Sequence, residues 1–354
     1  MDLRIDRFTA CSAFARHAIG NTVRYATVAL LLACTTSASF AQTRLYVVNG
    51  GDGTVSVIDT SNNHIVATII GPAPLLSITY NPNDGMLYLP TQEGDGKVHV
   101  LNPATLAFLK NPIAVGAFPS YMTISPKSDR GYVSNQFGGL SVVDMKKRSV
   151  ITELMGVTAP LGSALATESG KLYVINNQQS EVSVVDATSN TVLRSLPIGC
   201  LNPIDIKVDA ELHKAFATKS SCSEVAVIDT RTDAVSAVIT LPGGPPRRPQ
   251  FLVIDPIAHR AYVTVTWGSD EDGLSGGVAI LDTADNSIVG GIELGESPSR
   301  LALDISEHRL YVADRRGESV FVIDTQSNIV LGEIPVGSDP TDIAIVPAGH
   351  SKAN

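Results

Sequence analysis

The sequence predicts an all-β fold, a seven-bladed β-propeller made of four-stranded antiparallel blades. An aliphatic-Tyr-Val segment, as at 45–47, alternates along the chain with a Val-x-Val-Ile-Asp segment, as at 55–59. The second segment recurs seven times in steps of 43, 42, 42, 43, 53 and 42 residues, ending at Asp59, Asn102, Asp144, Asp186, Asp229, Asp282 and Asp324. A repeat of this length corresponds to one propeller blade, and no stretch after residue 41 has a convincing helical period.

Each repeat contains four short apolar blocks, which we interpret as four strands. In the seventh repeat they span 299–305, 309–313, 319–323 and 329–336. The blocks are rich in Val, Ile, Leu and Tyr and are bounded by turn-forming residues, as expected for strands. Because neighbouring blades cover both faces of a blade, strands such as 320–323 are apolar on both sides.

The seven Asp or Asn residues that end the third strands could be mistaken for a functional ring of carboxylates. Each begins a polar segment, such as 59–63 or 324–328. Asp and Asn side chains accept hydrogen bonds from nearby backbone N–H groups and favour turns. We therefore interpret the series as turn formers.

The phase of the repeat predicts how the ring closes. The repeats begin on a Tyr-Val strand at Arg44, yet the chain ends on an inner-type strand at 340–347. One blade must take its inner strand from the C-terminus and its other three strands from the N-terminus. This closure removes the unpaired sheet edges that an open array would leave.

These motifs carry a resemblance to a known family. Tyr-Val-x-Asn occurs at 46–49 and 132–135, Val-x-Val-Ile-Asp at 225–229, and Gly-x-x-Pro at 295–298. The chain resembles the YVTN-type β-propeller repeat proteins of prokaryotes over residues 44–347, including the exported YncE-like group. The resemblance is specific for the fold and does not identify a function, because such proteins include binding modules, surface proteins and lactonase-like propellers.

The first 41 residues lie outside the repeat and are expected to form a cleaved signal peptide. They combine basic residues, a short apolar stretch at 25–33 and Ser39-Phe40-Ala41 before the expected cleavage site. The single propeller domain would then span 42–350, with 351–354 as a tail. We expect a periplasmic or secreted protein; the alternative is a lipoprotein anchored through Cys34. No other segment is expected to span a membrane.

Charge and cysteine content fit export. The whole chain has a net charge of −9, and removing 1–41 takes away four Arg and two Asp, leaving −11. This charge argues against general attraction to nucleic acid. Cys200 and Cys222 would flank one blade on the same face, so we predict a disulfide between them. The alternative is two free or metal-binding thiols.

One candidate site lies where the period breaks. The 53-residue step contains 266–277, which we interpret as a long loop carrying Trp267, and the turn 243–249 before the same blade carries Arg247 and Arg248. Together they could hold an anionic or planar ligand. Alternatively, an arginine pairs with the acidic run 270–272 and holds the loop down. That run matches a calcium-binding loop only weakly.

A second candidate site is the mouth of the central channel. Counting two residues past each turn proline gives one position per blade: Leu76, Tyr121, Gly162, Asp205, Phe251, Arg300 and Asp342. We expect Arg300 and Asp342, on adjacent blades, to form a salt bridge, with Asp205 and Tyr121 adding polar groups and Arg315 projecting from a neighbouring loop. The mouth would suit a small anion or carbohydrate. A hydrated channel without function is the alternative.

No catalytic residues are assigned. His213, His259 and His308 fall in equivalent turns on the opposite face, too far apart to share a metal. We expect an exported, monomeric binding or scaffold propeller that engages an unknown small ligand or protein partner at the loop face and channel mouth, with no cofactor. The alternatives are a lactonase-like hydrolase, which would need a divalent metal in the channel, and an accessory protein of a periplasmic oxidation pathway.

Overall fold

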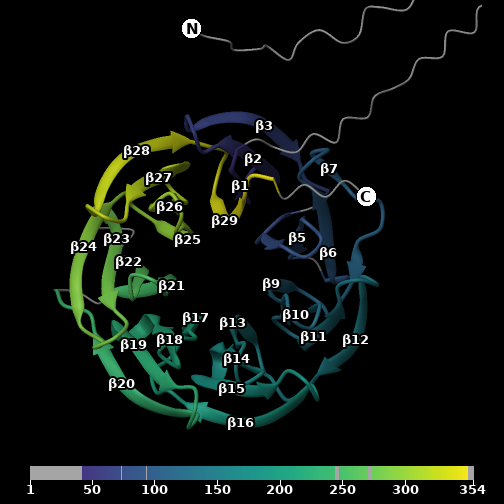
Figure 1. Cartoon of the computed structure of the whole chain (residues 1–354), viewed down its shortest axis with the longest axis vertical. Coiled ribbons are helices and arrows are strands. Elements are labelled where there is room, and N and C mark those ends of the chain that lie inside the picture. Colours follow the sequence, from purple (N-terminus) through teal and green to yellow (C-terminus); the bar gives the residue numbers. More distant parts are fainter. Residues whose placement is uncertain (1–41, 73, 93, 244–246, 270–272, 350–354) are drawn as a thin grey trace, which may run out of the picture. The chain divides into compact units, whose positions relative to one another are not determined.

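The computed structural model describes residues 42–349, apart from 73, 93, 244–246 and 270–272. Within this part of the chain, seven antiparallel sheets surround a central axis (Figure 1). The all-β seven-bladed propeller is confirmed. The signal peptide, the lipidation site at Cys34 and the tail lie outside the described residues.

The strands run from the axis outwards in each blade. Blade 1 contains β29 (Pro340–Val346), β1 (Arg44–Asn49), β2 (Thr54–Asp59) and β3 (His64–Ile70). Blade 2 contains β4 (Thr79–Asn81), β5 (Met86–Thr91), β6 (Lys97–Asn102) and an outer strand in two pieces, β7 (Ala107–Phe108) and β8 (Ile113–Ala114). Blade 3 contains β9 (Pro119–Ser125), β10 (Arg130–Asn135), β11 (Gly139–Asp144) and β12 (Ser149–Leu154).

The remaining blades follow the same order. Blade 4 contains β13 (Pro160–Ala166), β14 (Lys171–Asn176), β15 (Glu181–Asp186) and β16 (Thr191–Pro197). Blade 5 contains β17 (Pro203–Asp209), β18 (Lys214–Lys219), β19 (Glu224–Asp229) and β20 (Ala234–Thr240). Blade 6 contains β21 (Arg248–Asp255), β22 (Arg260–Ser269), β23 (Gly273–Asp282) and β24 (Ile288–Leu294). Blade 7 contains β25 (Pro298–Asp304), β26 (Arg309–Asp314), β27 (Ser319–Asp324) and β28 (Ile329–Pro335).

The ring closes as predicted, through blade 1. Strand β29 pairs antiparallel with β1, with Ala344 opposite Tyr46 and Val346 opposite Arg44. Ile343 packs into the apolar cluster between blades 7 and 1, whereas Ala344 and Val346 pack into the cluster between blades 1 and 2. The last strand therefore joins three blades.

The core consists of apolar layers between neighbouring blades, which explains the repeated tyrosine. The Tyr46, Tyr132 and Tyr173 side chains are buried between sheets. Each hydroxyl donates to a backbone carbonyl of a turn in the next blade; Tyr46, for example, donates to the Pro103 carbonyl at 3.2 Å. Tyrosine supplies both a large apolar body and a polar end that reaches across the blade interface.

The recurring Asp and His residues occupy turns. Asp59 Oδ1 accepts the backbone N–H of Ser61 at 2.9 Å, and Asn63 then adopts a φ of 60°. The turns between first and second strands contain His213, His259 and His308, also at positive φ values. The structure confirms the turn interpretation of the Asp series.

The 53-residue step was wrongly expected to form a long loop. It lengthens β22 and β23 to ten residues each, and the two strands stay paired as far as Ser269 and Gly273. Trp267 pairs with Ser275 within this extension. Alternation of polar and apolar residues continues through 263–267, so the hairpin can grow without changing the face of its side chains.

The predicted disulfide is present. Cys200 follows β16, and Cys222 ends the 3₁₀ turn η2 (Ser220–Cys222) between β18 and β19. Their Cα atoms are 6.1 Å apart. Besides η2, the described chain has one helical segment, the 3₁₀ turn η1 (Asn177–Gln179), and neither is a candidate membrane span.

Candidate functional site: a polar layer and cavity on the propeller axis

One position in each inner strand defines a layer of side chains across the axis. The register places it two residues before the residue that pairs with the repeated tyrosine, or its Phe216 equivalent. It holds Ser77, Tyr121, Gly162, Asp205, Phe251, Arg300 and Asp342. The predicted blade 2 member, Leu76, is wrong. In that blade Leu75, rather than Pro74, takes the place of the turn proline by bridging to Thr91.

Arg300 lies in the middle of this layer. Its guanidinium carbon is 4.0 Å from the ring centroid of Tyr121 and 4.0 Å from that of Phe251. The two rings come from blades on opposite sides of the axis, and their centroids are 6.3 Å apart. The central opening in Figure 1 is thus filled at this level by side chains.

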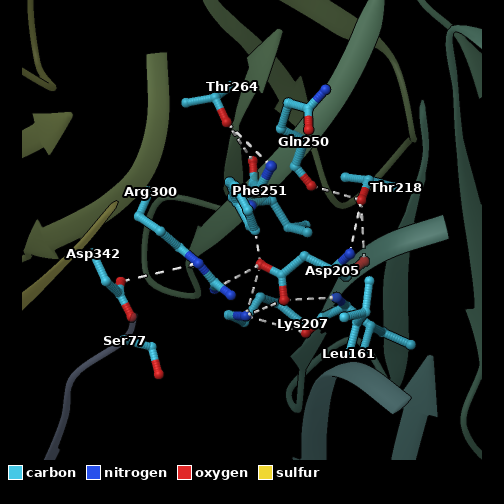
Figure 2. Close-up of polar contacts among 12 residues, drawn as sticks. Ser77, Leu161, Asp205, Lys207, Thr218, Gln250, Phe251, Thr264, Arg300 and Asp342 are labelled. Atoms are coloured by element: carbon cyan, nitrogen blue, oxygen red, sulfur yellow. Dashed lines mark hydrogen bonds and ion pairs between the residues drawn. The ribbon is translucent and has the colours of Figure 1, made fainter. Parts of the chain in front are cut away.

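Two carboxylates face the edges of the guanidinium. Arg300 Nη1 is 3.6 Å from Asp205 Oδ2, and Nε is 4.0 Å from Asp342 Oδ1 (Figure 2). The predicted Arg300–Asp342 ion pair is present, but both distances exceed that of a hydrogen bond. Although burial disfavours the charge, Tyr121 and the two carboxylates raise the pKa of Arg300 above its ordinary value, so the guanidinium is charged.

Asp205 is buried and well satisfied. Lys207 Nζ donates to both of its oxygens, at 2.7 and 2.9 Å, and the backbone N–H groups of Ile206 and Leu252 donate at 3.0 and 3.3 Å. Burial acts to raise the pKa of Asp205, but Lys207, Arg300 and the hydrogen bonds outweigh it and lower the pKa. A Cβ on Gly162 would lie 2.5 Å from Asp205 Oδ1, so blade 4 needs glycine here.

Asp342 is in a different electrostatic environment. Its oxygens accept the backbone N–H groups of Ile78 at 3.0 Å and Ile343 at 2.9 Å, without a direct lysine contact. Burial raises the pKa of Asp342, and Arg300 and the two N–H groups offset this only in part. The pKa values of Asp205 and Asp342 therefore shift in opposite directions, because Lys207 contacts only Asp205 directly.

A cavity of about 430 Å³ borders this layer. Its lining includes Tyr121, Asp205, Arg300 and Asp342 and continues past the hydroxyl residues Thr79 and Thr123 to Thr167, in a first-to-second-strand turn. The space thus lies along the axis on the side away from the predicted loop face.

The hydroxyl residues of the lining were missed in the sequence. Ser77, Thr79 and Thr123 donate to the backbone carbonyls of Ser120, Met122 and Ser163, at 2.6, 2.9 and 2.9 Å. Each bond reaches the adjacent blade, so the hydroxyl hydrogen is used and an oxygen lone pair remains. Thr79 and Thr123 each lie two residues after the axial-layer residue of the same inner strand. Counting two residues further along the strand from each axial-layer residue would therefore have identified both threonines.

The remaining candidate residues lie elsewhere. Arg315 donates to both Asp339 oxygens, at 2.6 and 3.0 Å, and is absent from the cavity lining. Arg247 lies over the Trp267 ring at 4.0 Å, beside a separate pocket of about 470 Å³ against β23 and β24. Arg248 begins β21 and is exposed. The alternative pairing with 270–272 and the calcium hypothesis lie outside the described residues.

Over the described residues, no group of three or more His, Cys, Asp or Glu side chains is arranged to hold a metal ion. In the channel, Arg300 lies between Asp205 and Asp342. Asp95, in the loop between β5 and β6, forms an ion pair with Lys97. This arrangement does not fit a carboxylate-held divalent metal.

Fold and axial layer together define a closed seven-bladed propeller with a polar axial cavity. No family model matches the chain. It is 29% identical over 156 residues to an uncharacterised protein YncE of Salmonella typhimurium, and equally to one of Salmonella typhi, covering 43% of this chain. The match spans only 40% of the length of these relatives.

Solved structures share the architecture. A functionally unknown protein of Desulfotomaculum acetoxidans is 13% identical with a TM-score of 0.68, covering 86% of this chain and 99% of that one. A Kuenenia stuttgartiensis hydrazine synthase chain is 16% identical, TM-score 0.67, covering 77% and 95%. Dihydro-heme d1 dehydrogenase NirN is 13% identical, TM-score 0.62, covering 87% and 75%. At these identities the likeness extends to the fold alone.

The sequence and structural matches together agree with the YVTN-type, YncE-like β-propeller family. The Cys200–Cys222 disulfide is typical of exported proteins.

Proposed function

We propose that this protein is an exported, monomeric binding propeller that holds a small molecule in its axial cavity, in the periplasm or after secretion. The observation that carries the proposal is the cavity of about 430 Å³, which residues from six of the seven blades line. Its size suits a small ligand, and its charged and hydroxyl groups could orient one. One chain closes the ring by itself, so the site requires no second copy.

Binding is favoured over lactonase-like hydrolysis. Metal-assisted hydrolysis would need carboxylate oxygens that are free to coordinate the metal. The Asp205 oxygens already accept hydrogen bonds from Lys207, and the Asp342 oxygens accept them from two backbone N–H groups. Arg300 also adds a fixed positive charge between them. These contacts support ligand binding rather than metal-assisted hydrolysis as the function of the cavity.

Native mass spectrometry of the purified protein, with and without a small-molecule extract of the source culture, tests the proposal. We expect a retained small molecule in the wild type. It should be lost in Thr123→Phe, which places a ring in the cavity, and kept in Thr191→Phe, at an exposed position of an outer strand. Equal retention by a folded Thr123→Phe variant would show that the axial cavity is not the site.

A further inference from the structure

The hydrogen-bonding groups of the axial cavity are unequally satisfied. Asp205 and Asp342 accept hydrogen bonds through all four of their oxygens. Arg300 Nε and Nη2, in contrast, are buried and have no hydrogen-bond partner among the described residues. A buried donor without a partner has a substantial free-energy cost, so what this site lacks is an acceptor.

The surroundings of Arg300 restrict where that acceptor can bind. The rings of Tyr121 and Phe251 cover the guanidinium plane at 4.0 Å, so an acceptor has to approach its N–H edge. The carboxylates beside that edge stay at 3.6 and 4.0 Å, beyond hydrogen-bond distance. The edge of a held guanidinium is a planar donor fork that matches a carboxylate. Its orientation is set before binding, so little side-chain entropy remains to be lost.

The cavity wall adds the complementary chemistry. The Ser77, Thr79 and Thr123 hydroxyls each donate to a carbonyl of the next blade. The free capacity of their oxygen atoms is therefore as acceptors, which suits the O–H groups of a ligand. A molecule that accepts at one end and donates along its length matches both parts of the cavity.

We infer that the axial cavity binds a small carboxylate that carries several hydroxyl groups, with the carboxylate on the N–H edge of Arg300 and the hydroxyl groups along Ser77, Thr79 and Thr123. This inference rests on the proposed function and specifies its ligand class. A monosaccharide-sized acid is compatible with a cavity of about 430 Å³.

The acidic residues of the site do not oppose this assignment. Lys207 and Arg300 balance the formal charges of Asp205 and Asp342, so an unliganded site is close to neutral. Burial already raises the pKa of Asp342. A bound carboxylate raises it further, and uptake of one proton by Asp342 restores the charge balance. Tyr121 also contacts Arg300, through its ring face.

Three matched probes test the ligand class by isothermal titration calorimetry on the purified full chain. D-glucuronate has the carboxylate and the hydroxyl groups, D-glucose lacks the carboxylate, and hexanoate lacks the hydroxyl groups. We expect glucuronate to bind at least about tenfold more tightly than either, since one charge-assisted hydrogen bond contributes that much or more. Glucose binding as tightly as glucuronate would overturn the carboxylate assignment, and hexanoate doing so would overturn the role of the hydroxyl residues.

Variants locate the binding. Arg300→Gln should weaken glucuronate binding about 10- to 100-fold, whereas Arg194→Gln, at an exposed outer-strand position, should leave it unchanged. Thr123→Val keeps the side-chain shape and should weaken glucuronate while leaving hexanoate unaffected. If Arg300→Gln does not fold, the Thr123→Val comparison decides alone. Unchanged glucuronate affinity in both variants would refute the inference.

The result separates this inference from the function on which it rests. If glucuronate does not bind but native mass spectrometry finds a ligand that Thr123→Phe excludes, the ligand class is wrong and the axial binding function stands. If Thr123→Phe excludes no ligand, the function itself is wrong.

Discussion

Removing the last strand should destabilise the whole ring rather than its end. Deletion of 340–354 takes away Ile343 and Val346, which are 5% and 2% exposed, together with Ala344. Burial of each larger side chain contributes about 1.5–3 kcal/mol, so these two alone contribute about 3–6 kcal/mol. The deletion also exposes the paired edge of β1 and opens both apolar clusters beside blade 1.

That loss is comparable with the whole stability of a typical domain, about 5–15 kcal/mol. We therefore expect the truncated chain to lose its cooperative thermal transition, measured by circular dichroism and calorimetry. Deletion of 349–354 is the matched control, because it keeps all of β29. A chain lacking 340–354 that melted at the same temperature as this control would refute closure through blade 1.

Three further predictions concern single features. Replacing Cys200 and Cys222 by serine removes a disulfide between residues that are 22 positions apart in the sequence. The free energy of unfolding, measured by urea titration, should fall by roughly 3 kcal/mol, and an unchanged midpoint would contradict this estimate. Because folding raises the pKa of Asp342, the native state binds the extra proton, and stability should fall as pH rises from the ordinary carboxyl pKa through the raised one. Asp342→Asn should lack this slope when unfolding is compared across pH, and an identical slope would exclude Asp342 as its source. Trp267→Ala should weaken ligand binding in the pocket beside Arg247 but not ligand binding in the axial cavity. An equal loss of affinity at both pockets would show that they are coupled.

The fold could be predicted from the sequence because its determinants are local and repeated. In six of the seven repeats, Tyr46 or its equivalent lies 12 to 14 residues before the turn-forming Asp or Asn, so the period, strand order and closure can all be read from spacing. Ring closure needed only the phase of the first and last repeats. The disulfide followed because Cys200 and Cys222 fall in loops assigned to one face.

The site could be predicted only in part because it depends on register across blades. Tyr121, Asp205, Arg300 and Asp342 were found by counting from prolines, and the structure brings them together. The same count failed in blade 2, where Leu75 takes the structural place of the proline. The acceptor role of the threonines was out of reach, since it depends on carbonyls about 40 residues away in the next blade.

The unlike residues at the axial position follow from the geometry of a ring. The repeated tyrosines lie in separate apolar clusters between different blade pairs, so each repeat can use the same residue. Residues at the axial position meet on the axis, where seven equal charges would repel and seven large side chains would not fit. The charge of Arg300 is balanced there by the carboxylates of Asp205 and Asp342. Asp205 in turn fits only because residue 162 is a glycine, without a Cβ atom. We therefore expect substitutions in this layer to be strongly non-additive, because each blade supplies a group that another blade requires.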